Sequence, residues 1–380
     1  MDTKEAFCGY FAAGANPGRR IGVELEHFVL KADGSVCAYD EGSRRILEAL
    51  APDFEYKNVQ DGHLIGIAND DYCISLEPGA QLEVSISPKE NIRGICASFE
   101  SFYKRLAPEL AMCGVRLAAF GALDRRRVDK IPLIPKKRYE YMDRYFAETG
   151  SCGRYMMRAS ASCQFSVDYA DEADFVKKFR AAYLLTPVFA LLAANGGEGG
   201  FLKRIEIWDN VDPARTWVPE DLFSPGFGFG SYAEKIMDTP AIFMPQAGYT
   251  GDAKIGELAE KYGTDDEALE HFLSMVFPDV RLKKYIEIRV GDAMEYKAAA
   301  AYAAFGAAVL YRGADAVLRL LKDAEVGDIA AAKHAVARGG FDAEIYGMPA
   351  RKIVEFIAGL APEEWAELAH RRGDFENAQN

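Results

Sequence analysis

Several glutamate residues occupy alternate positions in short segments that show the polar–apolar alternation of β-strands. They are Glu24, Glu26, Glu83 and Glu287. Side chains two residues apart on a strand point to the same face of a sheet, so each carboxylate is expected on a polar face. If these strands belong to one sheet, the acids meet on one surface, where carboxylate oxygens suit hard cations such as Mg²⁺.

A fifth acid, Glu77, lies in the turn-like sequence Leu76-Glu77-Pro78-Gly79. Like charges packed together repel, which raises some pKa values or requires compensating cations. The alternative is a half-exposed antiparallel sheet with one solvated face, which is the usual origin of such alternation. Glutamate is a poor strand former, however, so its recurrence on several strands weighs against that alternative without excluding it.

The elements that must position these acids can be located from periodicity. The acid-bearing segments are 22–28, 81–87 and 285–290, and a fourth alternating segment runs from Arg158 to Asp168 with Gln164 on its polar face. Helix-like apolar spacing predicts helices over 91–113, 172–194 and 265–275, and a long alanine-rich helix within 295–322. Strands and helices do not alternate regularly, which favours an α+β fold on an antiparallel sheet. We expect a single domain over residues 1–380 with a mainly helical C-terminal part from about residue 295.

Composition excludes several classes of protein. The net charge of −13 argues against non-specific binding to nucleic acid or anionic lipid, and no apolar run is long enough to cross a membrane. The seven cysteines include no Cys-x-x-Cys, which argues against a disulfide framework or a zinc site and indicates a reducing cytoplasm. Neither a Gly-x-x-x-x-Gly-Lys-Ser/Thr loop nor a Gly-x-Ser-x-Gly element occurs, so a P-loop site and a serine hydrolase are not expected.

Longer motifs surround the acids and follow one another in a fixed order. They are Gly22-Val23-Glu24-Leu25-Glu26, Leu76-Glu77-Pro78-Gly79-Ala80-Gln81, Ile134-Pro135-Lys136-Lys137-Arg138-Tyr139, Tyr155-Met156-Met157-Arg158, Ile207-Trp208-Asp209, Asp212-Pro213-Ala214-Arg215-Thr216 and Tyr285-Ile286-Glu287-Ile288-Arg289. Through most of its length the chain resembles the glutamate–cysteine ligase family of the plant and actinobacterial type. The resemblance implies a fold like the catalytic domain of glutamine synthetase, in which a curved antiparallel sheet forms a funnel flanked by helices. The polar face of that sheet would hold ATP and its metal ions.

The resemblance also implies a reaction. ATP would be the co-substrate and two or more Mg²⁺ ions the cofactors, and the γ-carboxylate of glutamate would attack the γ-phosphate of ATP. The α-amine of a second substrate would then attack the γ-glutamyl phosphate and form an amide. Cysteine is the default acceptor, which would give γ-glutamylcysteine in glutathione biosynthesis.

Site residues carry over from the family motifs position by position. The implied metal ligands are Glu24, Glu26, Glu77, Glu83, Gln164 and Glu287. Arg289 would stabilise the transferring phosphoryl group, since a fixed guanidinium suits that charge, and with Glu24 it would contact ATP. Arg289, Glu287 and Glu26 are the implied catalytic residues. Arg215 is the candidate for gripping the α-carboxylate of glutamate, and the other implied substrate-binding residues are Arg158, Thr216 and Trp208.

Departures from the family pattern, among them a different loop at residues 195–200, leave the acceptor open. Ala80 replaces the second glycine of a Gly-Gly pair, and Trp217 follows Thr216 where relatives often carry glycine. One alternative is therefore a γ-glutamyl ligase that uses a different amine in a specialised pathway. Another is a non-catalytic relative that binds glutamate or a nucleotide. The expected partners are small-molecule substrates, with no nucleic acid and no membrane, and the expected form is a cytoplasmic monomer or homodimer.

Overall fold

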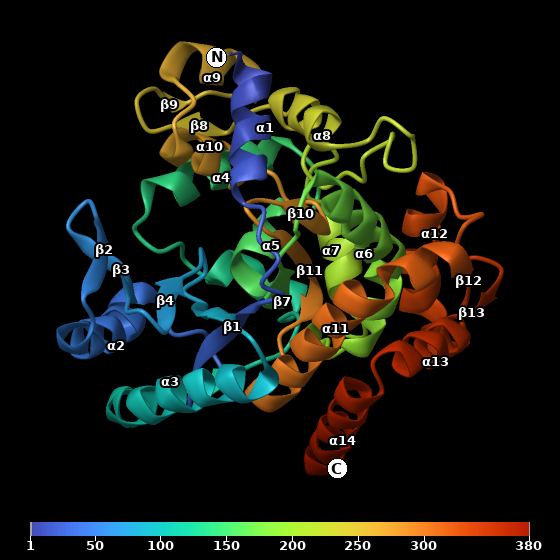
Figure 1. Ribbon diagram of the computed structural model, residues 1–380. Helices are drawn as coiled ribbons and strands as arrows, with labels where there is room; N and C mark the ends of the chain where they lie inside the picture. Colours follow the sequence, from blue (N-terminus) through green and yellow to red (C-terminus); the bar gives the residue numbers. More distant parts are fainter. Residues whose placement is uncertain (1, 380) are drawn as a thin grey trace.

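The predicted acid-bearing segments form part of one antiparallel sheet in the computed structural model (Figure 1), which describes the backbone of residues 2–379 and the side chains of residues 2–371. In spatial order the strands are β10 (Val280–Leu282), β11 (Ile286–Asp292), β7 (Ser162–Val167), β1 (Ile21–Lys31), β5 (Leu82–Lys89), β4 (Tyr72–Leu76), β3 (His63–Ala68) and β2 (Tyr56–Gln60). A further strand, β6 (Val115–Ala118), pairs with the C-terminal end of β1. Two short hairpins lie apart from this sheet: β8 (Phe243–Met244) with β9 (Gly248–Tyr249), and β12 (Glu344–Ile345) with β13 (Met348–Pro349).

Helices surround the sheet. They are α1 (Thr3–Ala13), α2 (Ser43–Leu50), α3 (Ile92–Cys113), α4 (Lys137–Glu148), α5 (Gly153–Ala159), α6 (Glu172–Leu192), α7 (Lys203–Asp209), α8 (Phe229–Met237), α9 (Ile255–Tyr262), α10 (Asp266–Leu273), α11 (Tyr296–Leu320), α12 (Val326–Gly339), α13 (Ala350–Leu360) and α14 (Pro362–Gln379). In Figure 1, α1, α8, α9 and α10 gather at one end of the molecule, and α12 to α14 lie on one side. No described helix has both the length and the apolar character that crossing a bilayer requires.

The apolar face of the sheet packs on long helices. Helix α11 contacts β1 and β7, α6 contacts β11, and α3 contacts β5. Small side chains let α11 approach closely: a Cβ added at Gly306 would lie 2.4 Å from Cζ of Phe165 on β7, so no larger residue fits there without movement. With this face sealed by α11, α6 and α3, the polar face of the central strands is left for the site.

Strand register brings the predicted polar positions side by side. Glu24 pairs with Gln164 on β7, and Glu26 pairs with Glu83 on β5. Glu287 on β11 pairs with Ser166 of the same strand β7. Directly paired residues in an antiparallel sheet have Cβ atoms about 5 Å apart, so these side chains share one surface.

The antiparallel sheet, the flanking helices and the long helix near residue 300 were predicted correctly, but one strand boundary was wrong. Arg158 does not belong to the alternating strand, which begins at Ser162; it lies in the last turn of α5. The hydroxyl of Ser160 donates to the carbonyl of Met156 at 2.8 Å and closes that helical turn. The alternation of residues 158–161 therefore came from the end of a helix and not from a strand.

Candidate active site

The acids of the sheet line a cavity of about 300 Å³, which we call the acidic cavity. Glu24 and Glu26 come from β1, Glu83 comes from β5, and Glu77 comes from the turn between β4 and β5. Its other walls carry positive charge from Lys136, Arg138, Arg281, Lys283 and Arg289. Four of the five predicted acids thus meet at one place, and a carboxylate-rich wall faces a cation-rich one.

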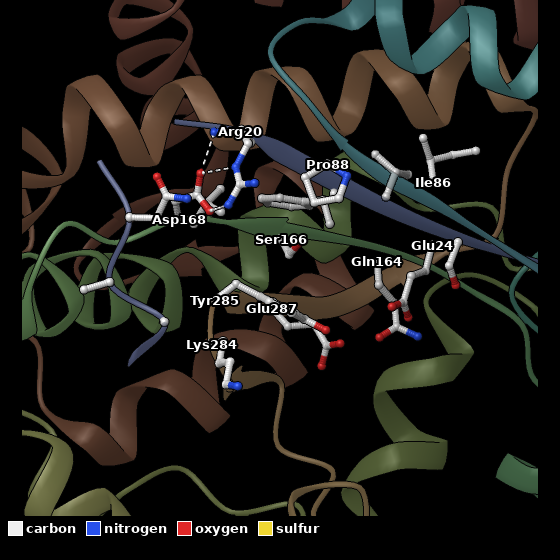
Figure 2. Close-up of a pocket in the computed structure, with 18 of the residues that line it drawn as sticks. Arg20, Glu24, Ile86, Pro88, Gln164, Ser166, Asp168, Lys284, Tyr285 and Glu287 are labelled. Carbon is white, nitrogen blue, oxygen red and sulfur yellow. Dashed lines mark hydrogen bonds and ion pairs between the residues drawn. The ribbon is translucent and has the colours of Figure 1, made fainter. Parts of the chain in front are cut away.

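A second cavity of about 360 Å³ opens beside the first and shares Glu24 and Gln164 with it. We call it the apolar cavity, because Val23, Ile86 and other apolar side chains of the sheet contribute much of its lining. Residues 13–16, at the end of α1 and directly after it, form another wall. Figure 2 shows Glu24, Gln164 and Glu287 at one end of this cavity and Arg20, paired with Asp168, at the other. The two cavities therefore meet at the polar centre of the sheet.

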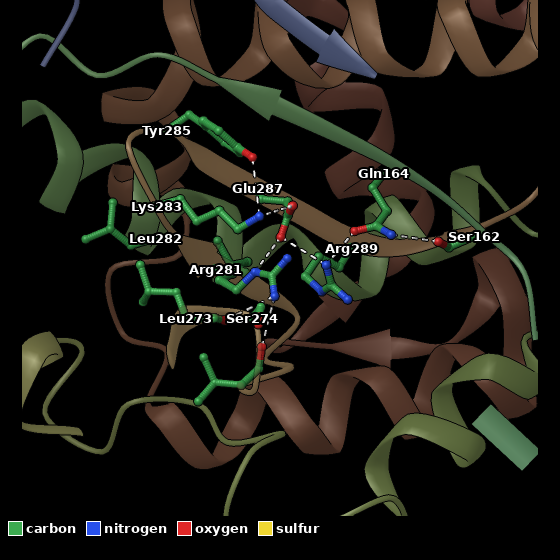
Figure 3. A network of polar contacts seen from close by, with 12 residues as sticks. Ser162, Gln164, Leu273, Ser274, Arg281, Leu282, Lys283, Tyr285, Glu287 and Arg289 are labelled. Carbon is green, nitrogen blue, oxygen red and sulfur yellow. Dashed lines mark hydrogen bonds and ion pairs between the residues drawn. The ribbon is translucent and has the colours of Figure 1, made fainter. Parts of the chain in front are cut away.

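Glu287 has several cationic neighbours (Figure 3). Its Oε2 lies 2.7 Å from Nε of Arg281 and 3.0 Å from Nη1 of Arg289, and its Oε1 lies 3.9 Å from Nζ of Lys283. Burial alone would raise the pKa of Glu287, but Arg281, Lys283 and Arg289 lower it instead. Glu287 is consequently ionised, while its buried Oε1 has no hydrogen-bond partner among the described residues.

The other acids lack comparable compensation. Burial, followed by the charge of Glu26, raises the pKa of Glu77 to about 7. Burial and Glu24 raise the pKa of Glu83 well above its usual value, and burial and Glu287 raise the pKa of Glu24. A carboxylate with a raised pKa gains from a nearby cation, because the cation relieves both the burial and the repulsion.

Arg289 lies where the two cavities meet. Its Nη1 donates to Oε1 of Gln164 at 2.6 Å and to Glu287 at 3.0 Å, and its guanidinium lies 5.7 Å from the ring centre of Trp208. These contacts fix the plane of the guanidinium while part of it faces the acidic cavity. A positioned guanidinium beside carboxylates suits a ligand that brings both phosphate and metal.

The predicted substrate-binding arginines lie elsewhere. Arg215 is fully buried, with Nε 2.8 Å from Oδ2 of Asp212, and its Nη1 donates to the carbonyl of Met275 at 2.8 Å. Arg158 pairs with Asp143 at 2.5 Å. Neither lines either cavity, and the same holds for Thr216, whose hydroxyl donates to the carbonyl of Asp212. Their roles in substrate binding stay predictions.

Sequence reasoning assigned no role to four of the cations that line the acidic cavity. They are Lys136, Arg138, Arg281 and Lys283. Arg281 and Lys283 are two residues apart, the spacing of one strand face, but β10 spans only Val280–Leu282 and is too short for alternation to stand out. Lys136 and Arg138 lie at the start of α4, where a charge run normally signals a solvated helix end.

The donor set of the acidic cavity suits a magnesium ion. Carboxylate and amide oxygens are the ligands that Mg²⁺ prefers. The unpartnered Oε1 of Glu287, which lines the adjoining apolar cavity together with Glu24 and Gln164, is a further donor of this kind. Across the described residues, no group of three or more His, Cys, Asp or Glu side chains is already arranged to hold a metal ion. Metal binding therefore requires the glutamate side chains to turn toward a common point, which partly exposed side chains in a cavity can do.

The fold and these cavities define the class of protein. The chain superposes on a crystal structure of glutamate–cysteine ligase from Francisella tularensis in complex with AMP, with a TM-score of 0.52 and 10% identity over 92% of this chain and 80% of that one. At this identity the match establishes the fold alone, which is the predicted carboxylate–amine ligase fold.

Sequence comparison then gives the family. The model of glutamate–cysteine ligase family 2 matches residues 20–377, and the chain belongs to this family. It is 32% identical to the chloroplastic glutamate–cysteine ligase of Brassica juncea over 81% of this chain and 64% of that protein. It is 29% identical to the chloroplastic enzyme of Arabidopsis thaliana over 99% of this chain and 76% of that protein. The chain spans slightly less than two thirds of the Brassica relative's length.

Proposed function

We propose that this chain is an ATP- and magnesium-dependent ligase that joins the γ-carboxylate of glutamate to the α-amine of cysteine. The observation that carries the proposal is the acidic cavity, where acids with raised pKa values face Arg289 across a space large enough for a small substrate. Family membership and the names of the plant relatives support the choice of glutamate and cysteine.

The apolar cavity suits the nucleotide. Its apolar side chains, Ile86 and Pro88 among them, can pack on a base, and its polar end at Glu24 and Gln164 opens toward the acidic cavity. A nucleotide bound along this cavity would place its terminal phosphate where the two cavities meet, within reach of Arg289. The remaining space of the acidic cavity would then hold glutamate and the acceptor.

The metal ligands we propose are Glu24, Glu26, Glu77, Glu83, Gln164 and Glu287. Two or more bound Mg²⁺ ions would neutralise phosphate and carboxylate charge during phosphoryl transfer. The protein's own contribution is the arrangement of the donors: Ser162 donates its N–H and its hydroxyl to Glu26 at 2.8 and 2.7 Å, and Ser75 donates to Glu83 at 2.9 Å. These bonds fix part of each carboxylate and leave lone pairs for a ligand.

The chemistry divides into two displacements. A carboxylate is a poor electrophile, so the γ-carboxylate of glutamate must first be activated. One of its oxygens attacks the γ-phosphorus of ATP, the bond from this phosphorus to the bridging oxygen breaks, and ADP leaves. The acceptor amine, after losing a proton, then attacks the γ-carbonyl carbon of the γ-glutamyl phosphate and inorganic phosphate leaves. Arg289 would stabilise the charge on the transferring group, and Glu287 holds Arg289 in place for this role.

The setting we propose is a cytoplasmic monomer or homodimer acting on small molecules. Cys8, Cys37, Cys73, Cys96, Cys113, Cys152 and Cys163 are all free thiols in the structure. Free thiols agree with a reducing compartment.

Mass spectrometry of the reaction products tests the proposal. The protein is incubated with glutamate, ATP and magnesium in the presence of a mixture of amino acids and simple amines. We expect γ-glutamylcysteine, together with one phosphate released for each amide formed. A γ-glutamyl product of another amine would overturn the choice of cysteine alone. ATP binding without turnover across all acceptors would support the non-catalytic relative and overturn the ligase.

A further inference from the structure

Most cations in and around the two cavities are matched by a carboxylate of the protein. Arg281, Lys283 and Arg289 share Glu287, Arg204 faces Asp292, Arg215 faces Asp212, and Arg20 faces Asp168. Each of these cations has a carboxylate oxygen of the protein within 4.0 Å, although Arg281, Lys283 and Arg289 share a single carboxylate. An ion pair of this kind positions the cation within the fold.

Lys136 and Arg138 differ from these cations. Among the described residues neither has a carboxylate oxygen within 4.0 Å, although both line the acidic cavity. The ammonium of Lys136 lies 3.5 Å from the hydroxyl of Tyr139 and 4.7 Å from its ring centre. Arg138 donates to the hydroxyl and the carbonyl of Ser274 at 2.7 and 2.5 Å, and both of these acceptors are neutral.

Neutral contacts hold these two side chains in place. The N–H of Ile134 donates to the carbonyl of Pro78 at 3.0 Å, which ties the segment before α4 to the turn that carries Glu77. Ser274 follows α10 and also lines the cavity, so Arg138 links α4 to the end of α10. Burial lowers the pKa of both Lys136 and Arg138, and Glu77 opposes this shift. Two cations are thus held by contacts that leave their charge unmatched.

An amino-acid substrate supplies the missing partner. Every such substrate carries an α-carboxylate, and a carboxylate bound by a lysine and an arginine forms charge-assisted hydrogen bonds. We propose that Lys136 and Arg138 bind the α-carboxylate of an amino-acid substrate in the acidic cavity. This proposal rests on the proposed ligase function and gives the carboxylate to different residues than the family-based candidate Arg215, whose charge Asp212 already matches.

The α-carboxylate has two sources, glutamate and the amine acceptor, and decarboxylated analogues separate them. Cysteamine is cysteine without its carboxylate, and 4-aminobutyrate is glutamate without its α-carboxylate. The variants are Lys136→Met and Arg138→Met, which remove charge at similar length, and Lys136→Arg, which keeps it. Lys137→Met is the matched control, because Lys137 is exposed and pairs with Glu140 on the outer surface of α4.

Binding is measured by isothermal titration calorimetry, alongside KM and kcat for both substrates. In Lys136→Met and Arg138→Met we expect the affinity for one amino acid to fall at least about tenfold, while that for its decarboxylated analogue stays unchanged. If the variants lose the preference for cysteine over cysteamine, Lys136 and Arg138 bind the carboxylate of the acceptor. If they lose the preference for glutamate over 4-aminobutyrate, these residues bind the α-carboxylate of glutamate. Lys136→Arg should keep most of the preference, and Lys137→Met should behave as the wild type.

Two outcomes would overturn the proposal. One is that the double variant Lys136→Met/Arg138→Met keeps the wild-type preference for cysteine over cysteamine and for glutamate over 4-aminobutyrate. The other is an equal loss of affinity for each amino acid and its analogue, which a general disturbance of the cavity would cause. If the wild-type protein forms no amide with any amine, the ligase proposal fails, and calorimetry with glutamate and cysteine still decides the role of Lys136. Thermal unfolding of each variant shows that it is folded, and Lys136→Gln replaces Lys136→Met if that variant does not fold.

Discussion

Two clusters of buried charge in this chain differ in how they are balanced. On α12, the buried Lys333 places Nζ 2.6 Å from Oδ1 of Asp209 and 2.7 Å from Oδ2 of Asp279. Burial alone would lower the pKa of Lys333, but Asp279 and Asp209 raise it, so the ion cluster satisfies itself. In the acidic cavity, by contrast, Glu77 and Glu83 have raised pKa values. A buried charge that the protein matches supports the fold, and one that it leaves unmatched marks a place for a ligand.

The matched cluster also supports the unmatched one. Asp279 accepts the backbone N–H of Arg289 at 3.0 Å through its carbonyl, and Asp209 follows Trp208 at the end of α7. Lys333 therefore joins the two segments that position Arg289 and Trp208. The C-terminal helices contribute to the site in this indirect way.

The largest effect is expected at the glutamates of the proposed metal site. Glu26→Gln and Glu287→Gln keep the size of the side chain but remove its charge. Glu26→Gln weakens one proposed metal ligand, and Glu287→Gln weakens another and also removes the anionic partner of Arg289. We expect phosphate release with glutamate, cysteine and ATP to fall at least about a hundredfold. Glu355→Gln, on the exposed face of α13, is the control. Near-normal activity at saturating magnesium would contradict the metal assignment.

Disruption of the matched cluster should affect stability. Lys333→Met leaves the partly buried Asp209 and Asp279 without the buried lysine between them, and we expect the free energy of unfolding to fall by about 3–5 kcal/mol. Lys352→Met, which breaks an exposed pair with Glu355, should cost less than about 1 kcal/mol. Denaturant titration measures both values. Equal losses in the two variants would show that Lys333 is no more important than a surface lysine.

A third buried pair lies between these extremes. Asp292 is 3.6 Å from Arg204 and accepts the N–H of Asn195 at 2.9 Å, yet burial raises its pKa to about 6. The native state then binds the proton more tightly than the unfolded chain, whose Asp292 has its ordinary pKa of 3.8. The stability that protonation of Asp292 adds to the native state is complete below pH 3.8 and is lost as the pH rises through about 6.

The comparison with Asp292→Asn isolates this contribution. As the pH falls from neutral toward 4, the wild type should gain up to about 3 kcal/mol of unfolding free energy relative to the variant. The measurement is a series of denaturant titrations of both proteins across this pH range. A difference that stays constant with pH would mean that Asp292 titrates normally in the fold.

The smallest effect expected is the stabilisation by the metal itself. At ten times its dissociation constant, magnesium should raise the free energy of unfolding by about 1.4 kcal/mol. Glu83→Gln removes one of the repelling acids, so the metal-free variant should be more stable than the wild type and should respond less to magnesium. Thermal unfolding with magnesium or a chelator measures both effects. An unchanged response in Glu83→Gln would remove Glu83 from the set of proposed ligands.

Much of the sheet was predictable because its strands obey local rules. The acid-bearing strands alternate clearly, and the Ala-rich stretch from residue 296 became the long helix α11. The hairpin of β2 and β3 was missed, although Asp61-Gly62 between them, with φ values of 49° and 80°, is a strong turn signal. The exposed strand β2 lacks the alternation that made the other strands visible.

The site was predictable only in part, for a physical reason. Alternation shows which side chains share a face, and this brought the glutamates together. Charge matching depends on contacts between distant segments, such as Arg138 with Ser274 or Lys333 with Asp209. No local pattern reports whether a cation has a partner, so the sequence did not separate Lys136 from the surface lysine beside it.

The central claim is that the glutamates of the acidic cavity hold divalent cations beside a nucleotide. A crystal structure of the protein with manganese and a non-hydrolysable ATP analogue, with the ions located by anomalous scattering, tests it most directly. We expect two or more ions within coordination distance of Glu24, Glu26, Glu77, Glu83 and Glu287, and the terminal phosphate beside Arg289. Ions or phosphates bound elsewhere, with these carboxylates left free of metal, would contradict the account.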